Sequence, residues 1–296
     1  MNISDKTILV AGATGRIGGA VIKTLLKNNV PVKALSRTPD SIAAQRLESQ
    51  GITVVKGDMA DTASLVKAIE GCYGVFSLQN YFEYGGDKEV QFGKNMADAA
   101  KKANISHFIF SSIASVDKDT KVPHFETKYT IEKYIREIGL NATILRPVKF
   151  MENYYILQVY KGILGGKLFD AIKGDKAHQL IALDDIGAYA YDAYSNPNKY
   201  MGKTIEIAGE EMKNDHVAAT ISEVFGHPVK FKNLPMFGAK MFMDKEVYIM
   251  YKWFNEKGYS VDIEGNKKNY PNVKITSFRQ WLINENWQRW NKKGTV

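Results

Sequence analysis

Short apolar runs alternate with helical patterns through the first 147 residues of the chain. Apolar, often β-branched runs indicate strands at 7–12, 32–37, 53–58, 74–79, 107–112 and 141–147. Between them, helical spacing indicates helices at 16–27, 42–50, 62–70, 89–103 and behind Pro123. This alternation predicts an α/β fold with a doubly wound parallel sheet, complete by about residue 150.

The second half of the chain has a different character. It carries a helix-prone aromatic stretch at 153–160, an apolar segment at 180–194, a strand at 204–209, a helix at 215–225 and a Met/aromatic stretch at 236–254. The last of these reads as the core of the second part or as a partner groove. We predict a cofactor domain over 1–150 and a smaller, helix-rich substrate or partner domain over 151–296. Residues 179–196 are a candidate to return to the first domain.

Composition narrows the class of protein further. With one cysteine in 296 residues, the chain forms no internal disulfide and offers no thiolate cluster, and the histidines show no metal-ligand spacing. The formal charge of +8 favours anionic partners, but Lys and Arg are spread along the chain, so nucleic-acid binding is not predicted. Neither a signal peptide nor a membrane-spanning run is recognisable, so a cytoplasmic location is expected.

The strongest motif is the glycine loop between the first strand and the first helix. Gly12, Gly15 and Gly18 are spaced G-x-x-G-x-x-G. Gly12 suits a tight turn, Gly15 a close approach to a pyrophosphate, and Gly18 close packing of helix on strand. The helix N-terminus then presents its amides to phosphate, with Thr14, Arg16 and Ile17 in the same loop. The motif predicts an NAD(P)-binding Rossmann fold.

The end of the second strand indicates which dinucleotide is bound. NAD sites usually carry an acidic residue there, whereas this chain has Ser36, Arg37 and Thr38. A guanidinium beside hydroxyls suits a 2′-phosphate, so NADP(H) is expected. The alternative for Arg37 is a solvated charge. Asp58, with Met59 beside it, is a candidate for the adenine side or else an ordinary loop aspartate.

The motifs GATGRIGG, LSRTPDS and GDMADTASLVKAIEGCYGVFSL together resemble the atypical short-chain dehydrogenase/reductases, and among them the NmrA-like family. The later segments QNYFEYGGDKEVQFGKNMADAAKKANISHFIFSS, VPHFETKYTIEKYIREIGLNATILRPVKFMENY and DDIG resemble that family in order and spacing. The resemblance covers residues 5–195 and is loose beyond about 200.

The resemblance implies a set of site residues. Active short-chain dehydrogenases use Tyr-x-x-x-Lys, and here His124 and Lys128 stand at the two positions. Lys128 is expected to hold the nicotinamide ribose and is a candidate catalytic residue, since a lysine at this site is the catalytic base in the isoflavone-reductase-like branch; a surface lysine is the alternative. His124 is a candidate proton donor, although a helix N-terminus and a neighbouring lysine favour its neutral form. Ser111 or Ser112 could assist, or could cap backbone groups.

Further positions that the resemblance places beside the nicotinamide are Gln79, Asn80 and Tyr81 after the fourth strand and Phe150 and Asn153 after the sixth. Ordinary packing at a strand end is the alternative for the last two.

Two functions are found among proteins of this kind, and the fold does not choose between them. The first is a redox sensor that binds NADP(H) and acts through a regulatory protein partner, such as a transcription factor. The second is an oxidoreductase that transfers hydride from NADPH to a quinone or small carbonyl substrate. The missing tyrosine makes the regulator our leading expectation, with the reductase as the alternative.

Overall fold

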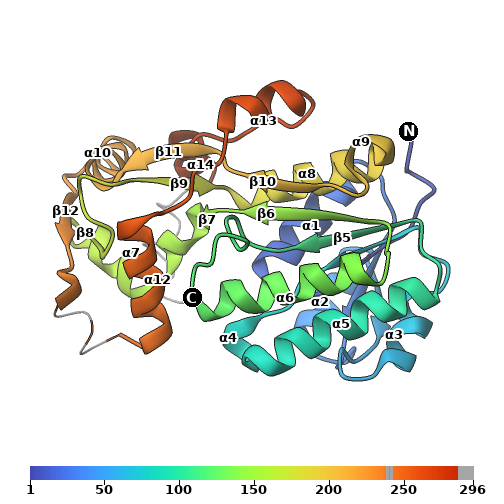
Figure 1. Ribbon diagram of the computed structural model, residues 1–296. Helices are drawn as coiled ribbons and strands as arrows, with labels where there is room; N and C mark the ends of the chain where they lie inside the picture. The colour runs from blue at the N-terminus through green and yellow to red at the C-terminus, as the bar shows by residue number, and fades with distance from the viewer. Residues whose placement is uncertain (238–239, 241–242, 286–296) are drawn as a thin grey trace. The chain divides into compact units, whose positions relative to one another are not determined.

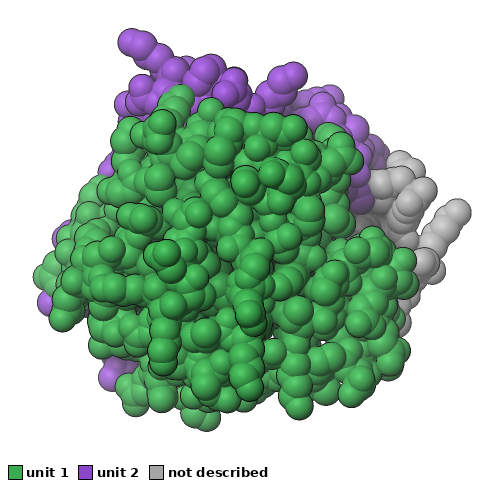
Figure 2. Space-filling view, turned by 90° about the vertical axis from the view of Figure 1, so that its right-hand side faces the viewer, with its two compact units in different colours: residues 1–119, 123–147, 183–206 green, residues 120–122, 148–182, 207–296 purple. Residues whose placement is uncertain are grey.

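The computed structural model describes residues 1–237, 240 and 243–285, and the chain divides into two compact units. Unit 1 comprises Met1–Asp119, Pro123–Pro147 and Leu183–Glu206, and unit 2 comprises Thr120–Val122, Val148–Ala182 and Ile207–Val296. Figure 2 colours the two units green and purple. The assignment of a cofactor role to one part and a substrate role to the other stays a prediction.

A seven-stranded sheet forms the centre of unit 1 (Figure 1). Its strands are β1 (Ile8–Val10), β2 (Val32–Ser36), β3 (Thr53–Lys56), β4 (Gly74–Ser77), β5 (His107–Ser111), β6 (Ala142–Pro147) and β10 (Thr204–Ile207). They are arranged in the order β10-β6-β5-β4-β1-β2-β3, and every neighbouring pair from β3 to β6 is parallel. The predicted doubly wound α/β fold is therefore confirmed.

Most of these strands end slightly before the residue that the sequence pattern indicated. β1 ends at Val10, because Gly12 has a φ of +65° and leaves the extended region. Likewise β2 ends before Arg37 and β4 before Gln79. The polar residues predicted at strand ends thus begin the loops at the carboxyl edge of the sheet.

Helices cover both faces of this sheet (Figure 1). Those of unit 1 are α1 (Arg16–Lys27), α2 (Ile42–Glu48), α3 (Thr62–Ile69), α4 (Tyr81–Tyr84), α5 (Gly86–Lys102), α6 (Pro123–Glu137), α8 (Leu183–Ser195) and α9 (Pro197–Tyr200). One core cluster joins α3, α5 and α6 to alternate strand residues such as Leu9 and Phe108. On the other face α1 packs against α8, where a Cβ on Gly187 would lie 2.5 Å from Thr24 Oγ1.

Unit 2 contains short strands as well as helices. Its strands are β7 (Lys149–Phe150), β8 (Lys167–Asp170), β9 (Ala177–Ile181), β11 (Glu210–Lys213) and β12 (Lys230–Asn233). They form a three-stranded sheet in the order β11-β9-β7 and the parallel pair β12-β8. Its helices are η1 (Met151–Tyr155, a 3₁₀ helix), α7 (Leu157–Leu164), α10 (Asn214–Phe225), α12 (Lys245–Glu256), α13 (Ile263–Asn269) and α14 (Phe278–Asn284). A second core cluster joins η1, α7, α10 and α14.

Several expectations for the second half are corrected by the structure. The helix-prone stretch at 153–160 is helical except at Ile156, where the 3₁₀ helix η1 ends and α7 begins. The segment 180–194 is split between β9 and α8, and the strand expected over 204–209 ends at Ile207. In the Met/aromatic stretch Trp253 and Phe254 are buried, while Phe237 is 93% exposed. Residues 238–239 and 241–242 of this stretch lie outside the described residues, as do residues 286–296.

In the part of the chain that the structure describes, no helix combines the length and the apolar character needed to cross a membrane.

The contact between Gly18 and the glycine loop yields a stability prediction. A Cβ on Gly18 would lie 2.2 Å from the Gly12 carbonyl oxygen, and this oxygen belongs to backbone that cannot rotate away like a flexible side chain. Gly18→Ala should therefore lower the free energy of unfolding by about 2 kcal/mol, the usual cost of overpacking. Gly19→Ala is the matched control, because a Cβ there meets nothing within 4 Å and alanine favours helix. Equal denaturant midpoints for the two variants would contradict this packing.

Candidate functional site

The glycine loop lies at the carboxyl edge of the sheet, between β1 and β4. Gly15 precedes α1 as its N-cap residue without a side-chain capping bond, and its N–H donates to the Gly12 carbonyl at 2.9 Å. Thr14, Gly15 and Arg16 are exposed, and Ile17 is half-buried. Because side chains do not cap the first turn of α1, its amides can receive an anion. The loop has the form that a dinucleotide pyrophosphate requires.

Arg37 lies just beyond β2 and contacts an aromatic ring at the end of α4. Its side chain is exposed, and its guanidinium carbon is 5.5 Å from the centroid of the Tyr84 ring. Burial chiefly, with a hydrogen bond to Glu83, raises the pKa of Tyr84, and Asp58 is near enough to raise it further. The structure thus brings Arg37, Tyr84 and Asp58 together on the β1–β3 half of the edge. Tyr84 was not among the predicted site residues.

Asp58 and Met59 shape the loop that follows β3. The Asp58 carboxylate accepts the N–H of Ala60 at 2.9 Å, so it stabilises a local turn. The carbonyl of Met59 accepts the side-chain amide of Asn95 at 2.8 Å, which ties this loop to α5. Met59 itself packs against the core of unit 1. Asp58 therefore has the structural role of an ordinary loop aspartate, which was the alternative given for it.

Lys128 is buried on α6, so the alternative of a surface lysine is wrong. Its ammonium donates to the Gln79 carbonyl at 2.8 Å and lies 3.0 Å from Oε1 of Glu89. Glu89, on α5, is fully buried and also accepts a hydrogen bond from Thr127. Lys128 is thereby held at the end of β4 as half of a buried ion pair. Glu89 was not predicted from the sequence.

His124 lies in the first turn of α6 among aromatic rings. Its ring centroid is 4.8 Å from that of Phe125, 5.1 Å from that of Phe82 and 5.8 Å from that of Tyr81. Burial, with a smaller effect from Lys128, lowers the pKa of His124 to about 4. The imidazole is therefore neutral at pH 7 and a poor proton donor. The sequence indicated the neutral form, but burial is its largest cause.

Gln79 and Asn80 begin the loop after β4. Gln79 is 3% exposed, and its side-chain amide donates to Ser77 Oγ at 2.9 Å. Asn80 is exposed and caps α4 by accepting the N–H of Phe82 at 3.2 Å. Among the described residues, neither Gln79 Oε1 nor His124 Nδ1 has a hydrogen-bond partner. Buried polar atoms require partners, so these two atoms suit a polar ligand group such as a nicotinamide amide or ribose.

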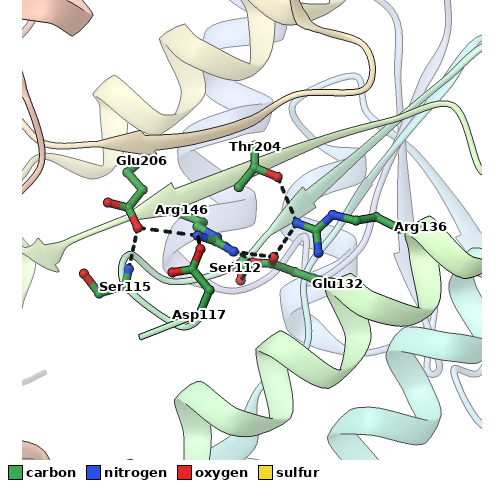
Figure 3. Close-up of polar contacts among 8 residues, drawn as sticks. All are labelled: Ser112, Ser115, Asp117, Glu132, Arg136, Arg146, Thr204 and Glu206. Carbon is green, nitrogen blue, oxygen red and sulfur yellow. Dashed lines mark hydrogen bonds and ion pairs between the residues drawn. The ribbon is translucent and has the colours of Figure 1, made fainter. Parts of the chain in front are cut away.

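The loop after β5 is fixed by a buried charge network (Figure 3). Arg146 of β6 binds Glu132 of α6 through two hydrogen bonds of 2.9 and 2.8 Å and binds Asp117 at 2.8 Å. Ser112 donates its hydroxyl hydrogen to Glu132, so this serine is engaged by a carboxylate rather than by backbone. Ser111 is buried at the end of β5.

The same network reaches β10. Glu206 accepts the N–H of Ser115 at 2.6 Å and lies 3.5 Å from the Arg146 guanidinium. Ser115 has a φ of +62°, an uncommon conformation for a residue other than glycine. The network therefore stabilises a strained loop beside the candidate site. None of its charged members was predicted from the sequence.

Phe150 and Asn153 belong to unit 2. Phe150 pairs with Ile181 in the small sheet, and Asn153 lies in η1, where its carbonyl accepts the N–H of Ile156 at 3.2 Å. Both residues are half-buried. Their role beside the nicotinamide stays a prediction.

Among the described residues there is no group of three or more His, Cys, Asp or Glu side chains that could hold a metal.

Fold and loop together define an α/β protein of the Rossmann class with a glycine-rich turn before α1. The chain belongs to the NmrA-like family, whose model matches residues 4–282 and so extends beyond the resemblance read from the motifs. It is 28% identical over 304 residues to an NmrA-like family domain-containing protein of Dictyostelium discoideum, with 96% of this chain and 99% of the relative aligned. It is 29% identical over 252 residues to the NmrA-like family domain-containing oxidoreductase FrzB of a Cladobotryum species, covering 76% and 75%.

Two solved structures share the fold. The NADPH-dependent quinone oxidoreductase QOR2 of Escherichia coli, complexed with NADPH, superposes with a TM-score of 0.79 at 24% identity, covering 94% of this chain and 99% of QOR2. Nmra, a negative transcriptional regulator in complex with NAD, superposes with a TM-score of 0.78 at 18% identity, covering 98% of each chain. At these identities the likeness establishes the architecture alone.

The depressed pKa of His124 predicts a pH dependence of stability. The folded-state pKa is about 4 and the ordinary value 6.5, so the unfolded chain binds the proton more readily. The neutral ring contributes fully to the free energy of unfolding above about pH 6.5, and this contribution is lost as the pH falls toward 4. His124→Gln lacks the group that takes up this proton on unfolding. Its free energy of unfolding should therefore fall less steeply with decreasing pH than that of wild type, by up to about 1.4 kcal/mol per pH unit. Urea titrations at pH 7, 6, 5 and 4.5 measure it, and an unchanged slope would contradict a buried neutral His124.

Proposed function

We propose that the protein is an NADP(H)-dependent oxidoreductase that reduces quinone-type acceptors. The name of the relative FrzB supports an oxidoreductase, and the choice of acceptor is carried by the neutral, buried His124 beside a Lys128 that is already paired with Glu89. Such a site orients a cofactor and an acceptor but offers no side chain tuned as a proton donor at pH 7. The acceptor must therefore be a molecule that can accept a hydride without a side chain that donates a proton in the same step.

Cofactor binding is the first element of the proposal. The uncapped first turn of α1 supports binding of the pyrophosphate, as does the approach of Gly18 to Gly12. Arg37 supports selection of NADP(H) over NAD(H), because an exposed guanidinium at the end of β2 is suited to a 2′-phosphate. Tyr84, held against Arg37, adds an aromatic surface on the same half of the edge. The relatives' dinucleotides support the class of cofactor.

The nicotinamide half of the site is assigned to Gln79, His124 and Lys128. When bound, NADPH supplies a hydride from C4 of its nicotinamide ring. Lys128 is fixed by Gln79 and Glu89, so it can orient a ribose hydroxyl without itself moving. The free Gln79 Oε1 and His124 Nδ1 atoms provide further polar contacts.

The acceptor class follows from the proton balance. Hydride addition to an isolated ketone produces a strongly basic alkoxide, which demands an acid in the transition state. Addition to a quinone produces a delocalised hydroquinone anion that takes its proton from water afterwards. The aromatic rings of Tyr81 and Phe82 next to His124 also favour a planar acceptor. The names of the relatives FrzB and QOR2, an oxidoreductase and a quinone oxidoreductase, support this assignment.

A redox-responsive regulator is the second candidate. The replacement of tyrosine by a neutral His124 leaves a site able to bind dinucleotide without turning it over. The fold shared with Nmra, a negative transcriptional regulator, is compatible with this role. On this reading a protein partner responds to the cofactor bound.

Reduction of a soluble quinone followed at the nicotinamide absorbance tests the first proposal. Wild-type protein should oxidise NADPH with quinones far faster than with aliphatic ketones, and should prefer NADPH to NADH. Arg37→Ala should lower kcat/KM for NADPH by about tenfold or more and leave that for NADH nearly unchanged, since it removes the contact to the 2′-phosphate. Arg46→Ala, at an exposed arginine on the nearby α2, is the control and should change neither value.

Equal losses with NADPH and NADH in Arg37→Ala would overturn the cofactor assignment. Tight NADPH binding without turnover across a broad quinone panel would favour the regulator instead. Faster reduction of ketones than of quinones would contradict the argument from the missing acid.

A further inference from the structure

The ion pair between Lys128 and Glu89 joins α6 to α5 and is almost completely buried. The side chains of Lys128 and Glu89 are 7% and 0% exposed, and the ammonium lies 3.0 Å from the carboxylate. The other carboxylate oxygen of Glu89 accepts the hydroxyl of Thr127. The pair has no net charge, and each ion is deprived of water that would otherwise screen it.

The position of the pair relative to a dinucleotide follows from the sheet order. β1 lies between β2 and β4, so the strand order reverses at β1 and β4, where doubly wound sheets bind ligands. The glycine loop and Arg37 belong to the half built on β1 to β3. Lys128 donates to the carbonyl of Gln79, two residues beyond the end of β4, and so belongs to the other half. The second nucleotide, which carries the nicotinamide, is bound by this half.

Oxidised and reduced nicotinamides differ by one positive charge on the ring. An uncompensated ammonium in poorly solvated surroundings would repel the oxidised ring and leave the reduced ring almost unaffected. A carboxylate in contact with that ammonium cancels most of the repulsion. The charge state of this pair therefore bears directly on which form of the cofactor the protein retains.

We propose that Glu89 sets the relative affinity of the site for oxidised and reduced cofactor by neutralising Lys128. This inference rests on the proposed binding of NADP(H) and goes beyond it, because it assigns redox selectivity to a residue on α5. Glu89 acts through Lys128 and is a positioning and charge-compensating residue. In an enzyme it eases product exchange, and in a sensor it fixes the cofactor ratio at which the protein responds.

Dissociation constants of NADP⁺ and NADPH, measured by calorimetry on the full chain, test the proposal. Glu89→Gln keeps the shape and removes the charge, so the ratio of the NADP⁺ constant to the NADPH constant should rise about tenfold. Lys128→Met leaves the carboxylate alone, and the ratio should fall. The double variant Glu89→Gln/Lys128→Met has no charge at either position, and its ratio should return to within about twofold of wild type.

Asp98→Asn is the matched control, because it removes one negative charge from the same helix. Asp98 lies nine residues from Glu89, about 13 Å along α5, and accepts a hydrogen bond from Tyr134. Its ratio should equal that of wild type. If Glu89→Gln does not fold, Lys128→Met and the double variant still decide the matter.

The outcomes separate this inference from the proposed function. An unchanged ratio in both single variants, or shifts in the same direction, overturns the role of Glu89 while leaving cofactor binding intact. A shift in Asp98→Asn equal to that in Glu89→Gln also overturns it, because the effect would then be one of overall charge. Failure of the wild-type protein to bind either nucleotide would refute the proposed function itself.

Discussion

The placement of β1 between β2 and β4 is the constraint on which the candidate site depends. Parallel strands end at the same edge of a sheet, so the glycine loop after β1, Arg37 after β2 and Gln79 after β4 all reach that edge. The approach of Gly18 to the Gly12 carbonyl keeps α1 close to β1 and directs its first-turn amides to the same place. One sheet order and one close packing contact thus place the candidate site residues at a single edge of the sheet.

Two buried charged side chains of α6, Lys128 and Glu132, contact the segments that follow β4 and β5. Lys128 and Glu132 lie one helical turn apart and each has its partner on another element, Glu89 on α5 and Arg146 on β6. Removing water from these ions costs several kcal/mol each, and pairing offsets that cost without adding much stability beyond what apolar residues would provide. These buried ion pairs are therefore better explained by a functional role than by a contribution to stability. The Arg146 network stabilises the loop after β5, and the Lys128 pair holds a cation beside β4 without a net charge.

The fold could be predicted from the sequence, because its strands are buried apolar runs separated by periodic helices. The strands of unit 2 could not. Segments such as β11, EEMK, and β12, KFKN, are largely exposed and show no apolar run, so local propensity carries no signal there. The aromatic stretch at 153–160 gave no sign of its break at Ile156, which leaves Tyr154 and Tyr155 in η1 and Tyr160 in α7.

The candidate site shows the same division. The glycine loop, Arg37 and Lys128 were accessible because motifs carry them. Glu89 was not predicted, although it lies on the apolar face of α5 with Phe92 and Met96 at helical spacing. Lys128 lies in the same way on α6, with Ile131 and Ile135. Two opposite charges on the apolar faces of neighbouring helices are a usable signal of a buried pair. Tyr84 left no such sign, since only the fold brings the end of α4 to Arg37.

Hydrogen–deuterium exchange with and without NADPH tests whether the cofactor binds at the glycine loop. If unit 1 binds the cofactor at the carboxyl edge of β1 and β4, exchange should slow in peptides that cover residues 11–19 and 78–82. The amides of α10, on the surface of unit 2, should serve as an internal reference and remain unchanged. Unaltered exchange in the glycine loop at saturating NADPH, or protection confined to α10, would contradict this account.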